Sequence, residues 1–550
     1  MLTTELGAIA GDYDVVVVGS GVAGLVAATR TADAGLRVLV LEKAEKLGGT
    51  TAVGGGVAWV PDNDLMPGAG YSDSAEAGAD YLRAVTAGRM TDDEIAWYLG
   101  TSARAARYLA ERTLVRYRPL DRPDYHLDWA GAATGGRSLD NEPFDFTGRE
   151  ELAAAIRPSS YFPPITMHER DHLGGRPADP DLLDARDTAG VRTMGGALVG
   201  SLAATALDLG VDIVLGARVT GLDHLTDRRW QVAVETVDSR VRASHVVLAT
   251  GGFEWDKALT STLLKYPVSP ISAPSNTGDG LRLALRQGCA LRDATSVWGV
   301  PVITAPTQRY DGVQSGRMGN VEMTLPGSIT VNAAGRRFVN EALNYHDLNR
   351  VFGNIDPRTG RFANIPAWLI FDSRYLQRYS VAGCTPGDAE DWMLRGDTIE
   401  ELASAAGIEA AGLAGTIERF NASAVDGHDP EFGRGSSEED RHLGDLTNEP
   451  NPCLAPLAAP PFYAVQIHPG VLGTAGGIAV DLDGRIVDAH DQPIEGLFAA
   501  GNCSASAFHD AYPGGGATIG SALTRAFAVG ERIVSEHKGI AMQEALAVHA

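Results

Sequence analysis

The chain has 550 residues, of which 44% are hydrophobic and 21% are charged, and its formal net charge is −24 at pH 7. This length exceeds what one hydrophobic core usually supports, so we expect two domains or more. The acidic balance argues against nucleic acid or an anionic membrane as a partner, because both demand basic surface. The four cysteines have neither metal nor disulfide spacing and the N-terminus lacks a signal-peptide pattern, so we expect a cytoplasmic protein without a metal site.

The strongest motif lies in the stretch Tyr13–Gly35. Val15–Val18 form a β-branched run, typical of a strand buried on both faces of a parallel sheet. A G-x-G-x-x-G turn and a small-residue helix follow, and a second strand, Arg37–Leu41, ends at Glu42. The spacing predicts a dinucleotide site with the pyrophosphate at the helix N-terminus and Glu42 on a ribose. The three glycines of the turn are Gly19, Gly21 and Gly24.

Two later glycine-rich strands decide between cofactors. Ser244–Gly252 (SHVVLATGG) and Gly496–Asn502 (GLFAAGN) are each expected to lie beside the first strand. One N-terminal fingerprint with these two returning strands resembles the FAD-binding fold of the glutathione-reductase type. The fold class predicted is therefore α/β, a Rossmann-like FAD-binding domain with an inserted α+β catalytic domain. No second fingerprint for a nicotinamide is visible, so a quinone is the expected electron acceptor.

The change in sequence texture sets the expected domain limits. Residues 1–297 and 469–550 are assigned to the FAD-binding domain and residues 298–468 to the inserted domain. Residues 195–209 are expected to form a packed helix, and 399–420 another helical stretch. The segment 157–187 is rich in Pro, Asp and Gly and has few cues for regular structure. Its apolar residues Tyr161, Phe162 and Ile165 leave peripheral membrane attachment as a minority alternative, because a single aromatic loop is more often packed down.

The C-terminal turn Tyr512–Gly520 is the most informative chemical feature. Three successive glycines before a helix leave backbone N–H groups uncovered, so the turn can stabilise a developing negative charge. The phenol of Tyr512 could supply a second donor. A neutral substrate is indicated, since the segment between Asn502 and Thr524 contains no Arg or Lys.

Four passages resemble the 3-ketosteroid Δ1-dehydrogenase family. They are PDYHLDWAGAATGGRSLDNEPFD (123–145), LPGSITVNAAGRRFVNEALNYHD (325–347), NEPNPCLAPLAAPPFYAVQIHPGVLGTAGGIAVD (448–481) and GLFAAGNCSASAFHDAYPGGGATIGSA (496–522). With the N-terminal fingerprint they run from end to end of the chain. The resemblance implies removal of a proton from C2 and transfer of a hydride from C1 of a 3-ketosteroid to N5 of FAD.

The resemblance also assigns roles to individual residues. Tyr512 and the backbone N–H of Gly516 match the pair that polarises the C3 carbonyl, and Tyr345 matches the tyrosine that removes the proton. Tyr125 matches a supporting tyrosine, with Tyr117 as second choice. The further residues expected to hold FAD, bound non-covalently, are Lys43, Gly49, Thr50, Thr51, Ala249, Thr250, Gly251, Asp279, Gly501, Asn502 and Ile519. His509, Asp510 and Arg525 depart from the family pattern, and we expect the first two to face solvent.

Three other functions stay open. A fumarate-reductase-like enzyme would need paired cations for two carboxylates, and Arg336 and Arg337, which follow a turn, are expected to be solvated. A 3-ketosteroid Δ4-(5α)-dehydrogenase would share the carbonyl-polarising turn but place its base differently. A flavin-binding protein without turnover would bind FAD that no ketosteroid reduces.

Overall fold

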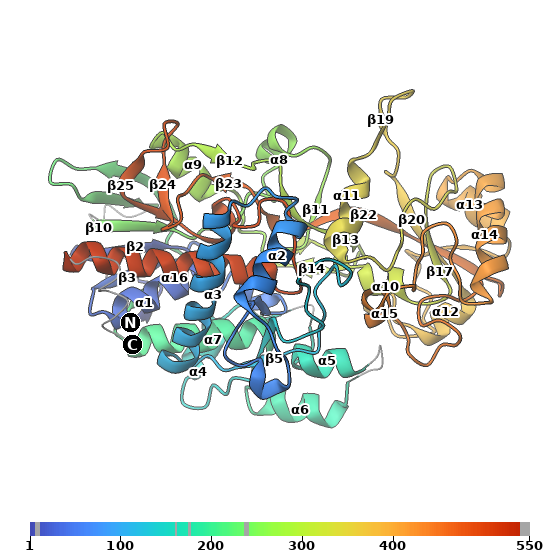
Figure 1. Cartoon of the computed structure of the whole chain (residues 1–550), viewed down its shortest axis with the longest axis horizontal. Helices are drawn as coiled ribbons and strands as arrows, with labels where there is room; N and C mark the ends of the chain where they lie inside the picture. The colour runs from blue at the N-terminus through green and yellow to red at the C-terminus, as the bar shows by residue number, and fades with distance from the viewer. Residues whose placement is uncertain (6–10, 160–161, 174–177, 236–240, 540–550) are drawn as a thin grey trace.

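The computed structural model describes residues 1–5, 11–159, 162–173, 178–235 and 241–539. The molecule is elongated in the view of Figure 1, with one large β-sheet towards each end. Within the described part of the chain, no helix combines the length and the apolar character that a membrane span requires. The fold is mixed α/β, and both sheets contribute to the site described below.

The first sheet has nine strands, and its main path is β1-β7-β3-β2-β10-β25-β24. Its centre is parallel: β10 (Val241–Leu248) lies between β2 (Gly11–Val18) and β25 (Pro493–Ala499). The prediction that both later strands return beside the first is therefore confirmed. The other strands of this sheet are β1 (Leu2–Thr3), β3 (Val38–Leu41), β7 (Asp212–Val214), β8 (Val219–His224), β9 (Trp230–Val234) and β24 (Arg485–Val487).

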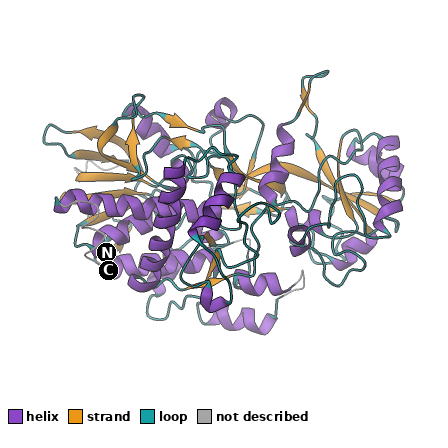
Figure 2. Cartoon of the chain, in the orientation of Figure 1, coloured by secondary structure: helices purple, strands orange, loops and turns teal. Residues whose placement is uncertain are grey.

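The β-branched run in β2 is buried on both faces of this sheet, as its composition predicts. Val15 and Val17 face one core, built with α1 (Val22–Asp33), α7 (Met194–Asp208) and α16 (Ala517–Lys538). Val16 and Val18 face a second core with residues of β8 and β9. Figure 2 shows the helices gathered along the first face. α1 packs against both α7 and α16, and α7 confirms the packed helix expected over 195–209.

The second sheet has seven strands, with the path β16-β13-β22-β20-β17. Its longest member, β22 (Phe462–Thr474), pairs antiparallel with both β13 (Val297–Ile303) and β20 (Ala367–Asp372). The helical stretch expected over 399–420 is two helices, because Gly407 adopts φ +67° and ends the first one. The expected boundary at 468 falls inside β22, and the domain limits stay a prediction. The other members are β11 (Ser269–Pro270), β16 (Arg317–Met318), β17 (Ser328–Asn332) and β21 (Leu394–Gly396), and the two helices are α13 (Ile399–Ala406) and α14 (Ala410–Ala424).

The segment expected to lack regular structure contains two helices. These are α5 (Met167–Leu173) and α6 (Pro180–Thr188). α6 begins where Asp179 caps the helix and Pro180 takes its first position, a start signal that the composition argument overlooked. Ile165 is buried and Phe162 half-buried, whereas Tyr161 lies outside the described residues. Ile165 is thus packed down, as the favoured interpretation of this segment predicts, and does not support the minority alternative of a membrane contact.

The remaining elements connect or flank these layers. They are α2 (Ala75–Val85), α3 (Asp92–Arg112), α4 (Glu150–Ala155), α8 (Lys257–Leu263), α9 (Asp279–Arg286), α10 (Asn320–Thr324), α11 (Tyr345–Arg350), α12 (Ser373–Arg378), α15 (Glu438–His442), β4 (Ala58–Trp59), β5 (Tyr117–Pro119), β6 (Ser138–Asn141), β12 (Leu291–Arg292), β14 (Arg309–Tyr310), β15 (Val313–Gln314), β18 (Ile355–Asp356), β19 (Arg361–Phe362) and β23 (Gly477–Ile478).

Candidate active site

The turn between β2 and α1 has the close contacts that its glycines predict. A Cβ on Gly19, whose φ is +109°, would lie 2.3 Å from the carbonyl oxygen of Ala249 in the strand alongside. A Cβ on Gly24 would lie 2.0 Å from the carbonyl oxygen of Gly19. Gly21 precedes α1 without capping it through a side chain, so N–H groups at this helix N-terminus face the cavity in front of it. This is the geometry that a pyrophosphate requires.

Glu42, at the end of β3, is fixed beside the same turn. Its carboxylate accepts hydrogen bonds from the backbone N–H of Ser20 (3.0 Å), the hydroxyl of Ser20 (2.7 Å) and the N–H of Ala44 (2.9 Å). Thr51 lies on the other side, where its hydroxyl oxygen accepts the N–H of Val22 at 3.1 Å. These contacts hold the acidic residue and the loop of Thr51 at the N-terminus of α1.

A second polar cluster lies in the wall of the same cavity, around Lys43 and Asp279. The ammonium of Lys43 donates to Thr277 and to Asp279, both at 2.8 Å, and Arg218 also pairs with Asp279. Burial raises the pKa of Asp279, but the hydrogen bonds and charges of Arg218 and Lys43 outweigh it and leave the pKa below its usual value. Asp279 is therefore ionised and anchored where the cavity wall turns into α9.

Glu254 is a buried residue that the sequence reasoning missed. It follows the glycines after β10, and its carboxylate accepts hydrogen bonds from Asn276 (2.8 Å) and from the N–H of Thr474 (3.3 Å). Burial raises its pKa. The sequence could have indicated Glu254, because this acidic residue comes just after the C-terminal end of a parallel strand, where ligands of such sheets bind. Glu254 thus connects the loop of Asn276 and the segment after β10 to Thr474 at the end of β22.

The residues expected to hold FAD line one continuous cavity. All except Gly24, which packs the turn, belong to its wall: Gly19, Gly21, Glu42, Lys43, Gly49, Thr50, Thr51, Ala249, Thr250, Gly251, Asp279, Gly501, Asn502 and Ile519. The helix N-terminus, where Thr51 accepts the Val22 N–H and Gly21 adds no side-chain cap, and the glycine cradle fit a dinucleotide on steric and electrostatic grounds.

The other end of this cavity contains three tyrosines from distant parts of the chain. The hydroxyl oxygens of Tyr345 and Tyr512 are 2.7 Å apart and share a hydrogen bond. The ring of Tyr125 stacks on Tyr512 (centroids 5.7 Å apart) and meets Tyr345 edge-on (5.6 Å). All three line the cavity, whereas Tyr117, the second choice, is not among its lining residues. The structure thus brings together the tyrosines that the resemblance singled out.

The C-terminal turn is anchored from the segment that carries Tyr125. The N–H of Tyr125 donates to the carbonyl of Pro513 at 3.2 Å, and the hydroxyl of Tyr81 donates to the same oxygen at 2.6 Å. Gly516 has φ +99°, and a Cβ there would lie 2.6 Å from the carbonyl oxygen of Val57. Among the residues that the structure describes, none accepts a hydrogen bond from the Gly516 N–H. This donor is therefore free to meet a substrate oxygen.

Burial dominates the electrostatics of the tyrosines. It raises the pKa of Tyr345 and of Tyr512 well above the usual value of a phenol. The hydrogen bond to Tyr512 and the guanidinium of Arg122 act in the opposite direction on the pKa of Tyr345. Ionised Tyr345 would therefore depend on these two neighbours for its stabilisation.

Two arginines line the tyrosine end of the cavity, and the sequence reasoning missed both. Arg122 precedes Tyr125 by three residues and forms a two-pronged ion pair with Asp171 of α5 (2.6 and 3.1 Å). Arg170, also on α5, lines the cavity next to it. The expectation of a neutral substrate rested on the segment 502–524 alone and did not consider these two arginines, which come from other parts of the chain.

Helix α15 adds two titratable side chains to this wall. Burial, assisted by nearby acids, raises the pKa of Glu439 to about 9. Burial and the charge of Arg122 lower the pKa of His442 to about 4. Both side chains are therefore neutral at pH 7.

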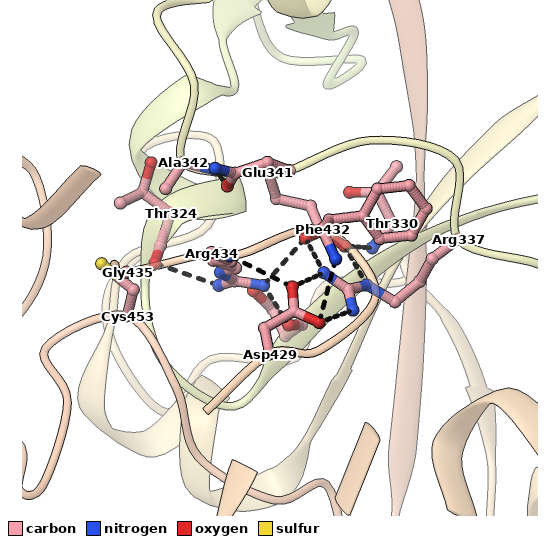
Figure 3. A network of polar contacts seen from close by, with 12 residues as sticks. Thr324, Thr330, Arg337, Glu341, Ala342, Asp429, Phe432, Arg434, Gly435 and Cys453 are labelled. Atoms are coloured by element: carbon pink, nitrogen blue, oxygen red, sulfur yellow. Dashed lines mark hydrogen bonds and ion pairs between the residues drawn. The ribbon is translucent and has the colours of Figure 1, made fainter. Parts of the chain in front are cut away.

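The loop before Tyr345 is held by a buried ion network, drawn in Figure 3. Arg337 pairs with Glu341 (2.6 Å) and with Asp429 (2.7 Å), and Arg434 donates to the carbonyl of Ser328 (2.8 Å). The side chain of Arg337 is 1% exposed, so the expectation that it is solvated is wrong. Four carboxylate hydrogen bonds compensate its burial. The network positions the strand-to-helix loop that ends at Tyr345.

The residues that depart from the family pattern lie outside this cavity. Asp510 is 41% exposed and pairs with Arg89, as expected for a surface acid. The side chain of His509 is 14% exposed, and its Nδ1 lies 2.7 Å from a carboxylate oxygen of Asp293, so the expectation of solvent is wrong for it. Arg525 is buried under Trp97 and donates to the carbonyl of Asp481.

Comparison with known proteins agrees with the cofactor cradle. The model of the FAD binding domain family matches residues 14–519. The chain belongs to this family of flavoproteins. A curated relative, the 4-oxocyclohexanecarboxylate 2-dehydrogenase of Sinomonas cyclohexanicum, is 40% identical over 96% of this chain and 94% of its own. FAD is the cofactor of the family, and the chain is an FAD-dependent dehydrogenase of the steroid and oxocyclohexane type.

Two further relatives of this flavoprotein family act on steroids by name. The 3-oxosteroid 1-dehydrogenase of Mycobacterium tuberculosis is 33% identical over 93% of this chain and 96% of its own. The crystal structure of 3-ketosteroid Δ1-dehydrogenase from Sterolibacterium denitrificans, in complex with 1,4-androstadiene-3,17-dione, superposes with a TM-score of 0.88. It is 33% identical and covers 96% of this chain and 100% of its own. The resemblance found from the sequence is thereby confirmed.

Proposed function

We propose that the protein introduces a double bond next to the carbonyl of a six-membered cyclic ketone. The observation that carries this proposal is the cluster of Tyr125, Tyr345 and Tyr512 at one end of the FAD cavity, beside the free N–H of Gly516. The hydroxyl of Tyr512 and this N–H polarise the carbonyl and stabilise the enolate that forms when a neighbouring proton leaves. FAD, when bound, accepts the hydride from the adjacent carbon.

Tyr345 is proposed as the base that takes the proton. A phenol needs its ionised form to act in this way, and its buried position alone disfavours that form. The charge of Arg122 favours it throughout, and the hydrogen bond with Tyr512 favours it until the single O–H of Tyr512 is donated to the substrate carbonyl. Tyr125, packed edge-on against Tyr345, holds the ring in place. The net change is loss of a proton to Tyr345 and of a hydride to FAD, which leaves a carbon–carbon double bond conjugated with the ketone.

Two substrate classes have support. A 3-ketosteroid desaturated between C1 and C2 is supported by the two steroid dehydrogenases and by the high structural similarity to one of them. A monocyclic 4-oxocyclohexanecarboxylate is supported by the relative at 40% identity and by the two arginines in the cavity wall. A quinone is proposed as the electron acceptor, since the sequence has no second dinucleotide fingerprint.

Anaerobic mixing of the FAD-loaded protein with single ketones tests this function. We expect bleaching of the flavin absorbance by 5α-androstane-3,17-dione or by 4-oxocyclohexanecarboxylate, and a product with the ultraviolet absorbance of a conjugated ketone. The position of the new double bond in the steroid product separates Δ1 from Δ4 desaturation. Bleaching by succinate alone would favour a dicarboxylate enzyme. If no ketone bleached the bound flavin, the proposed function would be wrong and a non-catalytic flavoprotein would remain.

A further inference from the structure

We propose that Arg170 and Arg122 bind a carboxylate of the substrate, so that the physiological substrate is a cyclic ketone that also carries an acid group. This inference rests on the proposed function, because it concerns the same cavity. It names the substrate class and the residues that select it.

The charges in the outer wall of the cavity do not balance. Arg122 is paired through Nε and Nη2 with Asp171, which leaves its third nitrogen, Nη1, without a carboxylate partner among the described residues. No carboxylate of the described part of the chain lies within 4.0 Å of Arg170, whose contacts are the sulfur of Met167 (3.6 Å) and the ring of Phe162 (5.5 Å). Two guanidinium groups thus line the cavity, and Asp171 pairs with only one of them.

The neighbouring groups on α15 do not supply the missing negative charge. Glu439, which burial keeps protonated up to a pKa of about 9, is neutral at pH 7. His442 is neutral too, and its Nε2 is buried with no hydrogen-bond partner among the described residues. A guanidinium in the cavity wall without a carboxylate within 4.0 Å among the described residues, in a chain of net charge −24, is a local attraction for an anion.

A carboxylate fits this wall better than a neutral ring does. The planar fork of Arg170 can hold two carboxylate oxygens, with Nη1 of Arg122 or Nε2 of His442 as a further donor. A Cβ on Gly515 would lie 3.2 Å from Nη1 of Arg122, so this cation lies beside the turn that carries Gly516. A small ring could therefore reach the carbonyl donors and Arg122 together. A wholly neutral ketone would desolvate Arg170 without replacing its lost hydration.

The test compares an acid with its neutral ester in the FAD-loaded enzyme. The probes are 4-oxocyclohexanecarboxylate and its methyl ester, and the measurement is steady-state kcat and KM with anaerobic flavin bleaching. We expect Arg170→Gln to raise the KM for the acid about 10- to 100-fold, with kcat nearly kept and the ester little affected. Arg170→Lys should recover part of the loss. The matched control is Arg118→Gln, an exposed arginine outside the cavity.

Arg122 needs a paired substitution, because Arg122→Gln alone leaves Asp171 buried without its partner. Arg122→Gln combined with Asp171→Asn removes both charges and keeps the shapes. We expect it to weaken the preference for the acid, with bound FAD and the melting temperature reporting on the fold.

The inference is overturned if the wild-type enzyme uses the methyl ester as well as the acid, or if Arg170→Gln affects both alike. In that case the ketones still bleach the flavin, so the proposed function stands. If neither ketone nor any ketosteroid bleaches the flavin, the proposed function fails together with the inference.

Discussion

A single methyl group at Gly516 tests the carbonyl site most directly. The residue has φ +99°, and the Cβ of an alanine there would lie 2.6 Å from the carbonyl oxygen of Val57. Positive φ costs an alanine about 1–2 kcal/mol. The contact cannot relax cheaply, because Val57 directly precedes β4, and β4 is joined to the turn by the hydrogen bond from the N–H of Trp59 to the Gly516 carbonyl at 3.1 Å. The turn must therefore shift and move the free N–H.

Loss of one such donor in an oxyanion site typically slows the chemical step by about 10²- to 10³-fold. We expect this slowing in Gly516→Ala, measured as the anaerobic rate of flavin reduction at saturating ketone. Gly407→Ala is the matched control: its φ is +67°, a Cβ there would meet nothing within 4 Å, and it ends α13 far from the cavity. It should lower the free energy of unfolding by about 1–2 kcal/mol and leave the rate unchanged. Wild-type rates in FAD-loaded Gly516→Ala would refute the donor role.

Three more predictions concern the base, the buried ion network and the acid on α15. Tyr345→Phe should slow flavin reduction about 10²- to 10⁴-fold while FAD stays bound, and retained bleaching in this variant would contradict the role of Tyr345 as base. In the wild type the rate of flavin reduction should rise with pH, because burial raises the pKa of Tyr345. Arg337→Met should lower the free energy of unfolding by about 3–5 kcal/mol in urea titrations, because it leaves buried Asp429 without its ion pair and leaves Glu341 with Arg434 alone. Exposed Arg336→Met should change little. Glu439→Gln should raise the melting temperature at pH 8 but not at pH 4. The pKa of Glu439 is about 9 in the folded protein and about 4.3 in the unfolded chain. The wild type therefore loses stability as the pH rises from about 4.3 towards 9, and a neutral glutamine does not. Equal shifts at both pH values would argue against a buried neutral acid.

The centre of the first sheet was predictable because its signals are local. The spacing of Gly19 to Gly24 and the apolar strands around it have one common explanation, and the pairing of β10 with β2 and β25 follows from the parallel fold. The tyrosine cluster was predictable only through the resemblance. Nothing local distinguishes Tyr345 from a buried core tyrosine.

What could not be predicted depends on contacts between distant segments. Arg337 follows a turn, but Asp429, 92 residues later, gives it a buried partner. Arg170 lies in a segment judged irregular, and its place in the cavity depends on α5 packing beside the loop of Arg122. A charge count along one segment therefore underestimates the charge of a cavity that several segments build.

The thirteen-residue strand β22 has a consequence for how substrates reach the cavity. One end pairs with β20 and β21, and the other pairs with β13 and bonds to Glu254 beside the flavin-side loops. Because α11, which begins at Tyr345, packs on β13, strand β22 fixes the position of Tyr345 relative to the residues that would hold FAD. The distance between Tyr345 and the cofactor site is then set by the sheet and not by a hinge. The outer wall differs, because α5 and α15 are short helices and the Arg122–Asp171 ion pair ties α5 to the loop of Arg122, so we expect any opening there.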